Sequence, residues 1–432
     1  MKPEIKERID KIKRGEMPDG YKTSKIGVIP EDWDVKHLED ISNINPRKEA
    51  LDENDTVSFI SMSDVSDDAR LISYQPRLYK EVFKGFTSFR DGDVLVAKIT
   101  PCFENGKGAL VDNLINKTGF GSTEFHVLRS KKNGDELFIY YHTVTDRFRK
   151  IGEKNMTGTA GQKRIATDFV KGFLIPYPRN DIERKKIASI LSTWDKAIEL
   201  KEKLIEQKKQ QKKGLMQKLL TGEVRLPGFK GEWISAKIGE IGKTYNGLSG
   251  KTAEDFGAGK PYIPYKTIFD DTKIDIAKLD YVQIQEGENQ NRAKYGDIFF
   301  TTSSETPNEV GMSSVLLDEV DELYLNSFCF GYRLNNFNVL LPEFAQFLFR
   351  GNDFRRKIFG LAQGSTRFNI SKNEIMKIEV QLPSIEEQKS IAAILIKSDR
   401  EIKLLQKQVE YLKEQKKGLM QLLLTGKVRV QV

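Results

Sequence analysis

The sequence contains an internal duplication, which limits the folds that the chain can adopt. Residues 211–217 and 415–421 both read QKKGLMQ, and LTGEVR (220–225) and LTGKVR (424–429) follow at the same distance. The offset is 204 residues, since 415 minus 211 gives 204. It extends from 183–226 to 387–430 without a gap, and over half of these positions are identical. A period of this length repeats a whole domain rather than a solenoid unit, so the sequence predicts two similar halves.

The duplicated segments 181–220 and 385–424 have the pattern of long helices. Apolar residues recur on one face at close to heptad spacing, while Lys, Glu and Gln fill the other positions. A helix of about forty residues is about 60 Å long, and its seam needs a helical partner. We therefore predict that the two helices pack against each other. The residues expected at this contact are Ile187, Ile190, Leu191, Trp194, Ile198, Ile391, Ile394, Leu395, Ile402 and Leu405.

The stretches before each long helix are rich in strands and share one plan. DVLVAKIT (93–100) and YGDIFFTT (295–302) are β-branched or aromatic segments at matching places, as expected for buried strands. Segments 136–153 and 340–360 have helical spacing of apolar residues, and each is predicted to form one helix. We predict an α+β fold: two similar globular α/β domains separated by two long helices that pack as an antiparallel coiled coil. The expected boundaries are an N-terminal helix at 1–20, globular domains at 21–178 and 223–383, a central helix at 179–222, and a C-terminal helix and tail at 384–432.

Composition indicates the cellular compartment and the kind of partner to expect. No long uncharged apolar run is present, and the charged N-terminus is unlike a signal peptide. Two distant cysteines, Cys102 and Cys329, fit a reducing cytoplasm better than a disulfide framework. The net charge of +8 suits a polyanionic partner. We therefore expect a cytoplasmic protein with no membrane contact.

Motifs for catalysis and cofactor binding are incomplete. GLSGKT (247–252) resembles the end of a phosphate-binding loop, but Tyr245 stands where that loop needs glycine. No dinucleotide-binding glycine fingerprint is present, and three histidines without special spacing support neither a triad nor a transition-metal site. The sequence therefore predicts no catalytic residue, no cofactor and no metal.

Two pairs of polar segments have the side chains that proteins use to contact DNA. Gln and Arg can make paired hydrogen bonds to adenine and guanine edges, and Lys, Ser, Thr and Asn grip phosphates. These residues could equally be solvated turn residues. The candidates in the first half are Lys98, Thr100, Asn105, Lys107, Gln162, Lys163 and Arg164. The candidates in the second half are Thr301, Thr302, Ser303, Ser304, Asn308, Ser365, Thr366, Arg367 and Asn369.

Several further motifs accompany the duplicated helix ends. They are VIPEDW (28–33), YPRNDIERKKIA (177–188), LPSIEEQKSIA (382–392) and the paired GLMQKLLTGEVR and GLMQLLLTGKVR. With these motifs the chain resembles, over essentially its whole length, the specificity subunit of type I restriction–modification enzymes. The first copy departs from the pattern because residues 178–184 lack the Glu-Glu-Gln of 386–388.

The resemblance implies a division of labour. In that family the subunit is not an enzyme, and two target recognition domains read the two halves of a split, asymmetric site in double-stranded DNA. The helices set the spacer and dock two methyltransferase (modification) subunits, and restriction/translocase subunits join the complex. Two alternatives remain open at this point: a stand-alone DNA-modifying or DNA-cleaving enzyme with two DNA-reading lobes, and a coiled-coil scaffold that does not bind DNA.

Overall fold

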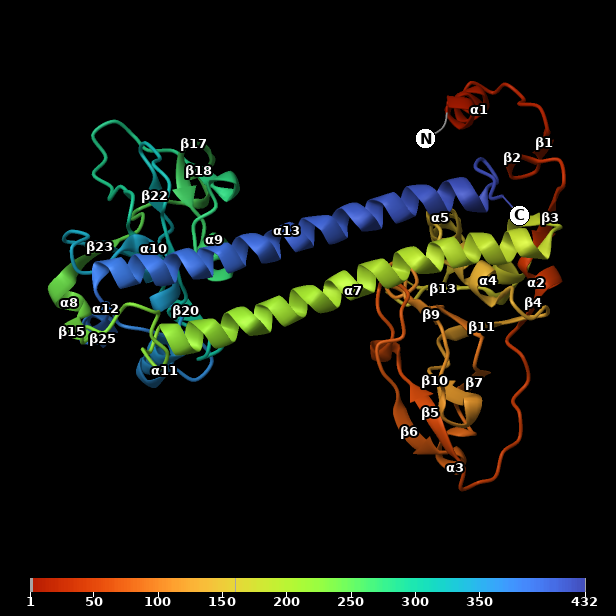
Figure 1. Ribbon diagram of the computed structural model, residues 1–432, viewed down its shortest axis with the longest axis horizontal. Helices are drawn as coiled ribbons and strands as arrows, with labels where there is room; N and C mark the ends of the chain where they lie inside the picture. Colours follow the sequence, from red (N-terminus) through yellow and green to blue (C-terminus); the bar gives the residue numbers. More distant parts are fainter. Residues whose placement is uncertain (1–2, 160, 432) are drawn as a thin grey trace. The chain divides into compact units, whose positions relative to one another are not determined.

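The computed structural model describes residues 3–159 and 161–431, and the chain forms two compact units (Figure 1). Unit 1 comprises residues 1–201 and 408–432, and unit 2 comprises residues 202–407. The long helices α7 (Asp181–Leu219) and α13 (Ile385–Leu424) each contribute one part to each unit. The boundaries expected from the sequence treat these helices as separate segments, whereas their contacts divide each helix between the units.

Polar contacts establish the direction in which α7 and α13 pack. In unit 1, Lys416 Nζ lies 2.5 Å from Asp195 Oδ1, and Lys201 Nζ donates to Gln408 Oε1 at 2.9 Å. In unit 2, Lys208 pairs with Glu401 at 2.7 Å and Lys212 pairs with Asp399 at 2.5 Å. Partner numbers fall along α13 as they rise along α7, which confirms the predicted antiparallel packing.

Each unit contains the same four-stranded antiparallel sheet. Its order is β4-β11-β8-β9 in unit 1 and β16-β23-β19-β21 in unit 2. The strands of unit 1 are β4 (Ser42–Ile44), β8 (Val94–Ala97), β9 (Gly108–Leu110) and β11 (Phe125–Ser130). Those of unit 2 are β16 (Gly242–Asn246), β19 (Ile298–Thr301), β21 (Ser313–Val315) and β23 (Cys329–Leu334). The shared topology confirms two similar globular domains.

An ion pair with a buried aspartate recurs in both copies of this sheet. Arg129 contacts Asp93 at 2.9 Å in unit 1, and Arg333 contacts Asp297 at 2.6 Å in unit 2. Both aspartates are almost fully buried, so each needs the charge-assisted hydrogen bonds that its arginine supplies. The pair is therefore part of the common scaffold.

The second sheet of each unit differs between the units. Unit 1 has the order β6-β5-β10-β7, whereas unit 2 has β18-β17-β22. The strands are β5 (Thr56–Ile60), β6 (Gln75–Leu78), β7 (Thr87–Arg90), β10 (Thr118–Gly121), β17 (Phe256–Ile263), β18 (Asp280–Val282) and β22 (Tyr324–Leu325). Divergence between the halves is therefore concentrated away from the shared sheet.

The remaining elements join the sheets to the long helices. In unit 1 they are α1 (Pro3–Lys13), β1 (Tyr21–Ser24), β2 (Gly27–Pro30), β3 (Trp33–His37), α2 (Leu38–Ile41), α3 (Tyr79–Val82), α6 (Thr167–Gly172) and β14 (Leu174–Pro178). In unit 2 they are β15 (Ile234–Lys237), α8 (Ile238–Ile241), α9 (Tyr265–Asp270), α12 (Lys372–Met376) and β25 (Glu379–Leu382). Strand β14 pairs with β3, and β25 pairs with β15 in the same antiparallel way. Helix α1 falls within the segment expected at 1–20, of which residues 1–2 lie outside the described part.

The prediction of single helices at 136–153 and 340–360 is wrong. Each segment forms two helices: α4 (Glu136–Thr143) and α5 (Asp146–Lys154) in unit 1, and α10 (Pro342–Leu348) and α11 (Asn352–Leu361) in unit 2. The Thr145 side chain accepts a hydrogen bond from Phe148 N and so caps the start of α5. Gly351 precedes α11 in an extended conformation. Apolar periodicity continues across both breaks because both helices of each pair face the core.

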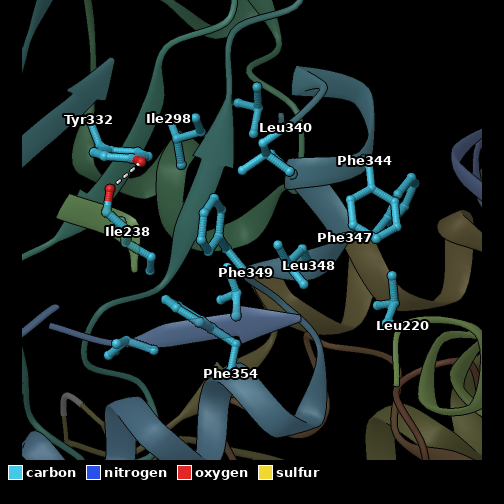
Figure 2. Packing of buried hydrophobic residues seen from close by; sticks show 14 of the residues in the cluster. Leu220, Ile238, Ile298, Tyr332, Leu340, Phe344, Phe347, Leu348, Phe349 and Phe354 are labelled. Atoms are coloured by element: carbon cyan, nitrogen blue, oxygen red, sulfur yellow. Dashed lines mark hydrogen bonds between the residues drawn. The ribbon is translucent and has the colours of Figure 1, made fainter. Parts of the chain in front are cut away.

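The seam of each long helix is shared between its helical partner and a globular core. Ile187 and Leu191 are buried with Trp33 and Phe138 of unit 1, together with Met420 of α13. Ile391 and Leu395 join the unit 2 core, where Leu220, the residue after α7, and the phenylalanines of α10 and α11 pack (Figure 2). Ile198 and Ile402 are buried, whereas Ile190, Trp194, Ile394 and Leu405 are partly exposed. Residues predicted to pack between the helices therefore also pack in the cores of the globular domains.

An arginine of the repeated GEVR and GKVR motifs closes each unit. Arg429 contacts Glu183 at 2.6 Å, at the start of α7, and its guanidinium lies 5.7 Å from the Trp33 ring. Arg225 contacts Glu387 at 2.6 Å, at the start of α13, and lies 5.7 Å from the Trp233 ring. The segment after α13 therefore contacts the start of α7 in unit 1, just as the segment after α7 contacts the start of α13 in unit 2.

Candidate nucleic-acid interface

The polar segments singled out in the sequence form two loops in each unit. Loops A1 (98–107) and A2 (302–312) connect β8 to β9 and β19 to β21. Loops B1 (155–166) and B2 (362–371) follow α5 and α11 and contain β12 (Met156–Thr157), β13 (Arg164–Ile165) and β24 (Phe368–Asn369). Within loop A2, β20 (Ser303–Ser304) is a short strand. Both pairs therefore lie at the same places on the common scaffold.

Backbone hydrogen bonds bring loops A and B together. In unit 1, Thr100 N donates to Lys163 O at 2.9 Å, and Ile165 N donates to Lys98 O at 3.0 Å. In unit 2, β20 pairs with β24, and Ile370 N donates to Thr302 O at 3.0 Å. Residues selected separately from the sequence thus belong to one surface in each unit, which chain order alone does not reveal.

Three candidates in unit 1 have exposed side chains on this surface. They are Asn105, Gln162 and Lys163. Arg164 is also exposed, but it makes a two-pronged contact with Glu124 at 2.8–3.0 Å that holds the pKa of this arginine above its usual value. DNA binding by Arg164 would therefore have to share or displace Glu124.

The other unit 1 candidates support the loops. Lys98 Nζ donates to Thr123 O at 2.8 Å, and burial lowers the pKa of Lys98. The Thr100 hydroxyl donates to Glu104 at 2.6 Å. Lys107 Nζ donates to the carbonyls of Met62 and Val65 at 3.1 and 2.9 Å. These contacts hold the backbone of loop A1 in a defined conformation.

Unit 2 divides its candidates in the same way. Thr301 is fully buried and its hydroxyl accepts from Met312 N, so the expectation that this side chain faces DNA is wrong. Ser303 is also buried, and Thr302 and Ser304 are partly exposed. The exposed candidates are Asn308, Ser365, Thr366, Arg367 and Asn369. Exposed side chains therefore come mainly from loop B2.

Sequence reasoning missed an aromatic part of the unit 2 surface. Phe328 has 57% of its side chain exposed, and the Arg367 guanidinium lies 6.0 Å from its ring. Tyr265 and Phe269 stack with ring centroids 6.1 Å apart. All four residues line one open hollow with Ser304. Phe328 directly precedes the apolar strand β23, and its residue type alone does not mark it as exposed. An exposed aromatic beside arginine can contact bases or their methyl groups.

His126 and His142 are buried rather than exposed on these surfaces. Burial lowers the pKa of His126 to about 4, and its Nε2 lies 3.0 Å from Ile165 O beneath loop B1. Burial also lowers the pKa of His142 to about 3. Among residues 3–159 and 161–431, no cluster of three or more His, Cys, Asp or Glu residues is suited to holding a metal ion. No helix in the described part of the chain is long and apolar enough to cross a membrane.

A second repeated surface lies where the long helices end. We name these surfaces the helix-end pockets. In unit 2 the pocket is lined by Met216, Gln217, Leu220 and Thr221 of the repeat, beside Asn352 at the start of α11. In unit 1 it is lined by Met420, Gln421, Leu424 and Thr425, beside Asp146 at the start of α5. The four repeat residues are identical, so the two units carry one surface twice.

Comparison with known proteins identifies the family. The model of the Type I restriction modification DNA specificity domain matches residues 30–210 and 230–414. The EcoEI specificity subunit of a type I restriction enzyme from Escherichia coli is 37% identical over 183 residues, which is 41% of this chain but only 30% of that relative. The aligned part thus spans less than a third of that relative. The putative MjaX specificity subunit from Methanocaldococcus jannaschii is 27% identical over 95% of this chain and 97% of its own length.

Solved structures share the fold. A chain from a study of complex assembly and conformational transition of the type I R-M system superposes with a TM-score of 0.60 at 18% identity, covering 93% of this chain and 99% of that chain. The S subunit of a type I restriction-modification system from M. genitalium gives a TM-score of 0.52 at 16% identity, covering 93% and 96%. Because the family model covers most of the sequence in two successive copies, this chain belongs to the type I restriction–modification DNA specificity domain family.

Proposed function

We propose that this chain is the non-catalytic, DNA-reading subunit of a type I restriction–modification complex. The observation that carries the proposal is a common scaffold that presents unlike loops at equivalent places. Loops A1 and B1 offer Asn105, Gln162 and Lys163, whereas loops A2 and B2 offer Arg367 beside an exposed phenylalanine. Two domains of the same fold with different exposed side chains are suited to recognising the two halves of a split, asymmetric DNA site. The comparisons give no support to a stand-alone enzyme.

The proposed reading mechanism separates affinity from specificity. Lysines near the loops contact phosphates and set the register, while Gln, Asn and Arg side chains read base edges. The electrostatic contribution makes binding weaken as salt rises. The two long helices set the spacer between the half-sites, since readers on one face of DNA are separated by about one helical turn, roughly 34–36 Å.

The helix-end pockets support two docking sites for one kind of partner. Identical residues at equivalent positions indicate selection for the same contact in both units, although the surrounding domains diverge. Each pocket combines an apolar floor, made by Met and Leu, with an exposed Gln and the first turn of a short helix. We assign the pockets to two copies of the methyltransferase subunit, and restriction/translocase subunits would join the resulting complex.

Filling a pocket should change the stoichiometry of the complex. Gln217→Trp and Gln421→Trp place a bulky ring over an exposed position in each pocket without removing a core residue. We expect either single variant to bind one methyltransferase subunit and the double variant to bind none, measured by native mass spectrometry. Gln210→Trp, on an exposed face of α7 outside the pocket, is the matched control and should bind two. Binding of two partners by the double variant would disprove this docking site.

Sequencing of methylated DNA tests the reading function. A host that expresses this chain with its methyltransferase subunit should methylate adenines within one split, asymmetric motif. A host with the methyltransferase alone should lack that motif, because we assign base recognition to this chain. If the same motif is methylated in both hosts, the chain does not select the sequence.

A further inference from the structure

An arginine near the start of a short helix holds loop A in each unit. In unit 2, Arg355 of α11 donates to the carbonyls of Asn308, Val310 and Gly311 at 2.7–2.8 Å. In unit 1, Arg149 of α5 donates to the carbonyls of Phe103 and Gly106 at 3.1 Å, with a longer contact of 3.5 Å to Lys107 O. All acceptors of each arginine lie in the final part of loop A.

The two arginines occupy equivalent positions. Each directly follows a buried phenylalanine, Phe148 or Phe354, and stands at the fourth residue of α5 or α11. Each also binds the carbonyl of a glycine with positive φ, Gly106 at +94° or Gly311 at +64°. A left-handed glycine near the end of the loop is thus fixed by the same donor in both units. The contact persists although other loop residues differ.

These guanidinium groups face the backbone of the loop rather than solvent. Both arginines are only partly exposed, and burial lowers the pKa of Arg149 to about 10, so it remains a cation at neutral pH. A planar guanidinium can serve several carbonyls at once from one fixed geometry, whereas a lysine ammonium acts as a single compact donor group. Loop A therefore has an anchor whose guanidinium is engaged by the carbonyls of the loop itself.

We propose that Arg149 and Arg355 are positioning residues for DNA specificity, each fixing loop A, which pairs with loop B in the surface that reads one half-site. This inference rests on the proposed function. Specificity needs side chains held in a defined place, because a displaced side chain cannot make paired hydrogen bonds to a base edge. Loss of the anchor lets loop A move, so the unit keeps its phosphate contacts but no longer distinguishes bases well. The effect stays within one unit because each arginine donates its hydrogen bonds to loop A of its own unit.

The test uses the assembled complex with its methyltransferase subunits. The probes are short DNA duplexes that carry the motif methylated by the wild type, and matched duplexes with one base pair changed in either half-site. For Arg355→Met we expect discrimination at one half-site to fall roughly ten- to hundredfold, the worth of one paired base contact. Discrimination at the other half-site should stay at the wild-type level, which also shows that the variant has folded. Arg149→Met should give the converse result, with loss at the other half-site.

Controls separate positioning from direct contact. Arg356→Met removes the same charge from an exposed neighbour on α11 and should leave both half-sites unchanged. Arg355→Lys retains the charge and should give an intermediate loss. The plot of log binding constant against log salt concentration should have the same slope for Arg355→Met as for the wild type. Loss of a residue that contacts a phosphate would instead lower the magnitude of this slope by about 0.9. A lowered slope, equal loss at both half-sites, or unchanged discrimination would each overturn the inference. A wild-type complex without any motif dependent on this chain would instead refute the proposed function.

Discussion

Replacing Asp135 with alanine is expected to destabilise unit 1 by about 3–5 kcal/mol. Asp135 and Arg184 are both 1% exposed, and Arg184 Nε lies 2.8 Å from Asp135 Oδ1. The second Asp135 oxygen accepts from the Tyr177 hydroxyl at 2.6 Å. Removal of the carboxylate leaves a buried guanidinium with a weaker set of partners and an unpaired hydroxyl. Breaking a buried pair in this way costs far more than loss of an exposed pair.

Tryptophan fluorescence can follow this effect in the full chain. Trp33 and Trp194 belong to unit 1, and Trp233 belongs to unit 2, so a Trp233→Phe background reports on unit 1 alone. The free energy of unfolding is then taken from urea titrations. The matched control is Asp181→Ala, because Asp181 pairs with the same arginine at 2.7 Å but is 41% exposed. We expect that control to lose about 1 kcal/mol or less.

A second substitution tests whether the stability loss of Asp135→Ala comes from the buried charge of Arg184 or from lost packing. Gln388 of unit 2 stands at the position equivalent to Arg184, and its amide contacts Leu341 N, Val339 O and Pro383 O at 2.8–3.0 Å. Arg184→Gln in the Asp135→Ala background should therefore recover part of the stability by removing the uncompensated charge. Equal losses for Asp135→Ala and Asp181→Ala would contradict the assignment of a buried ion pair.

The departure from the family pattern at 178–184 has a structural explanation. The first copy has arginine where the second has the glutamine of Glu-Glu-Gln. Both side chains are buried and both use the preceding backbone, since Arg184 also donates to Pro178 O at 2.6 Å. Aspartate at 135 compensates for the charge that arginine introduces. The architecture therefore tolerates the change.

The sequence predicted the features that depend on period and pattern. The duplication predicted two similar units, and the long apolar seams predicted helices with antiparallel packing. It did not predict that Arg429 would pair with Glu183 in unit 1, because a contact between residues far apart in the chain leaves no periodic signal. It also missed the breaks before Asp146 and Asn352, since core-facing periodicity continues across each turn.

The candidate interface was predictable in outline but not in detail. Polar residue types marked loops A and B, yet their pairing depends on strand neighbours that sequence order does not show. The polar side chains of Thr301 and Lys107 form hydrogen bonds with backbone groups of the protein itself. Phe328 is an apolar residue left exposed. Residue type therefore identified the segments, whereas only the fold separates side chains that face solvent from those that shape the loops.

Exchange of one recognition segment is expected to change half of the recognised sequence. Segment 45–175 contains loops A1 and B1, and 247–377 contains loops A2 and B2. Segment 45–175 begins after β4 and ends within β14, and segment 247–377 lies between β16 and β25. The donor for 45–175 must retain an acid at the place of Asp135 to pair with Arg184. With this pair kept, the exchanged loops alone should change the bases that are read.

The most direct test of two independent readers is sequencing of methylated DNA from hosts that carry the native chain, the 45–175 exchange or the 247–377 exchange, each with the same methyltransferase subunit. We expect each exchange to replace a different half-site while the other half-site and the spacer stay as in the native motif. A change of both half-sites by either exchange, or no change by either, would contradict the claim that each unit reads one half of the DNA site.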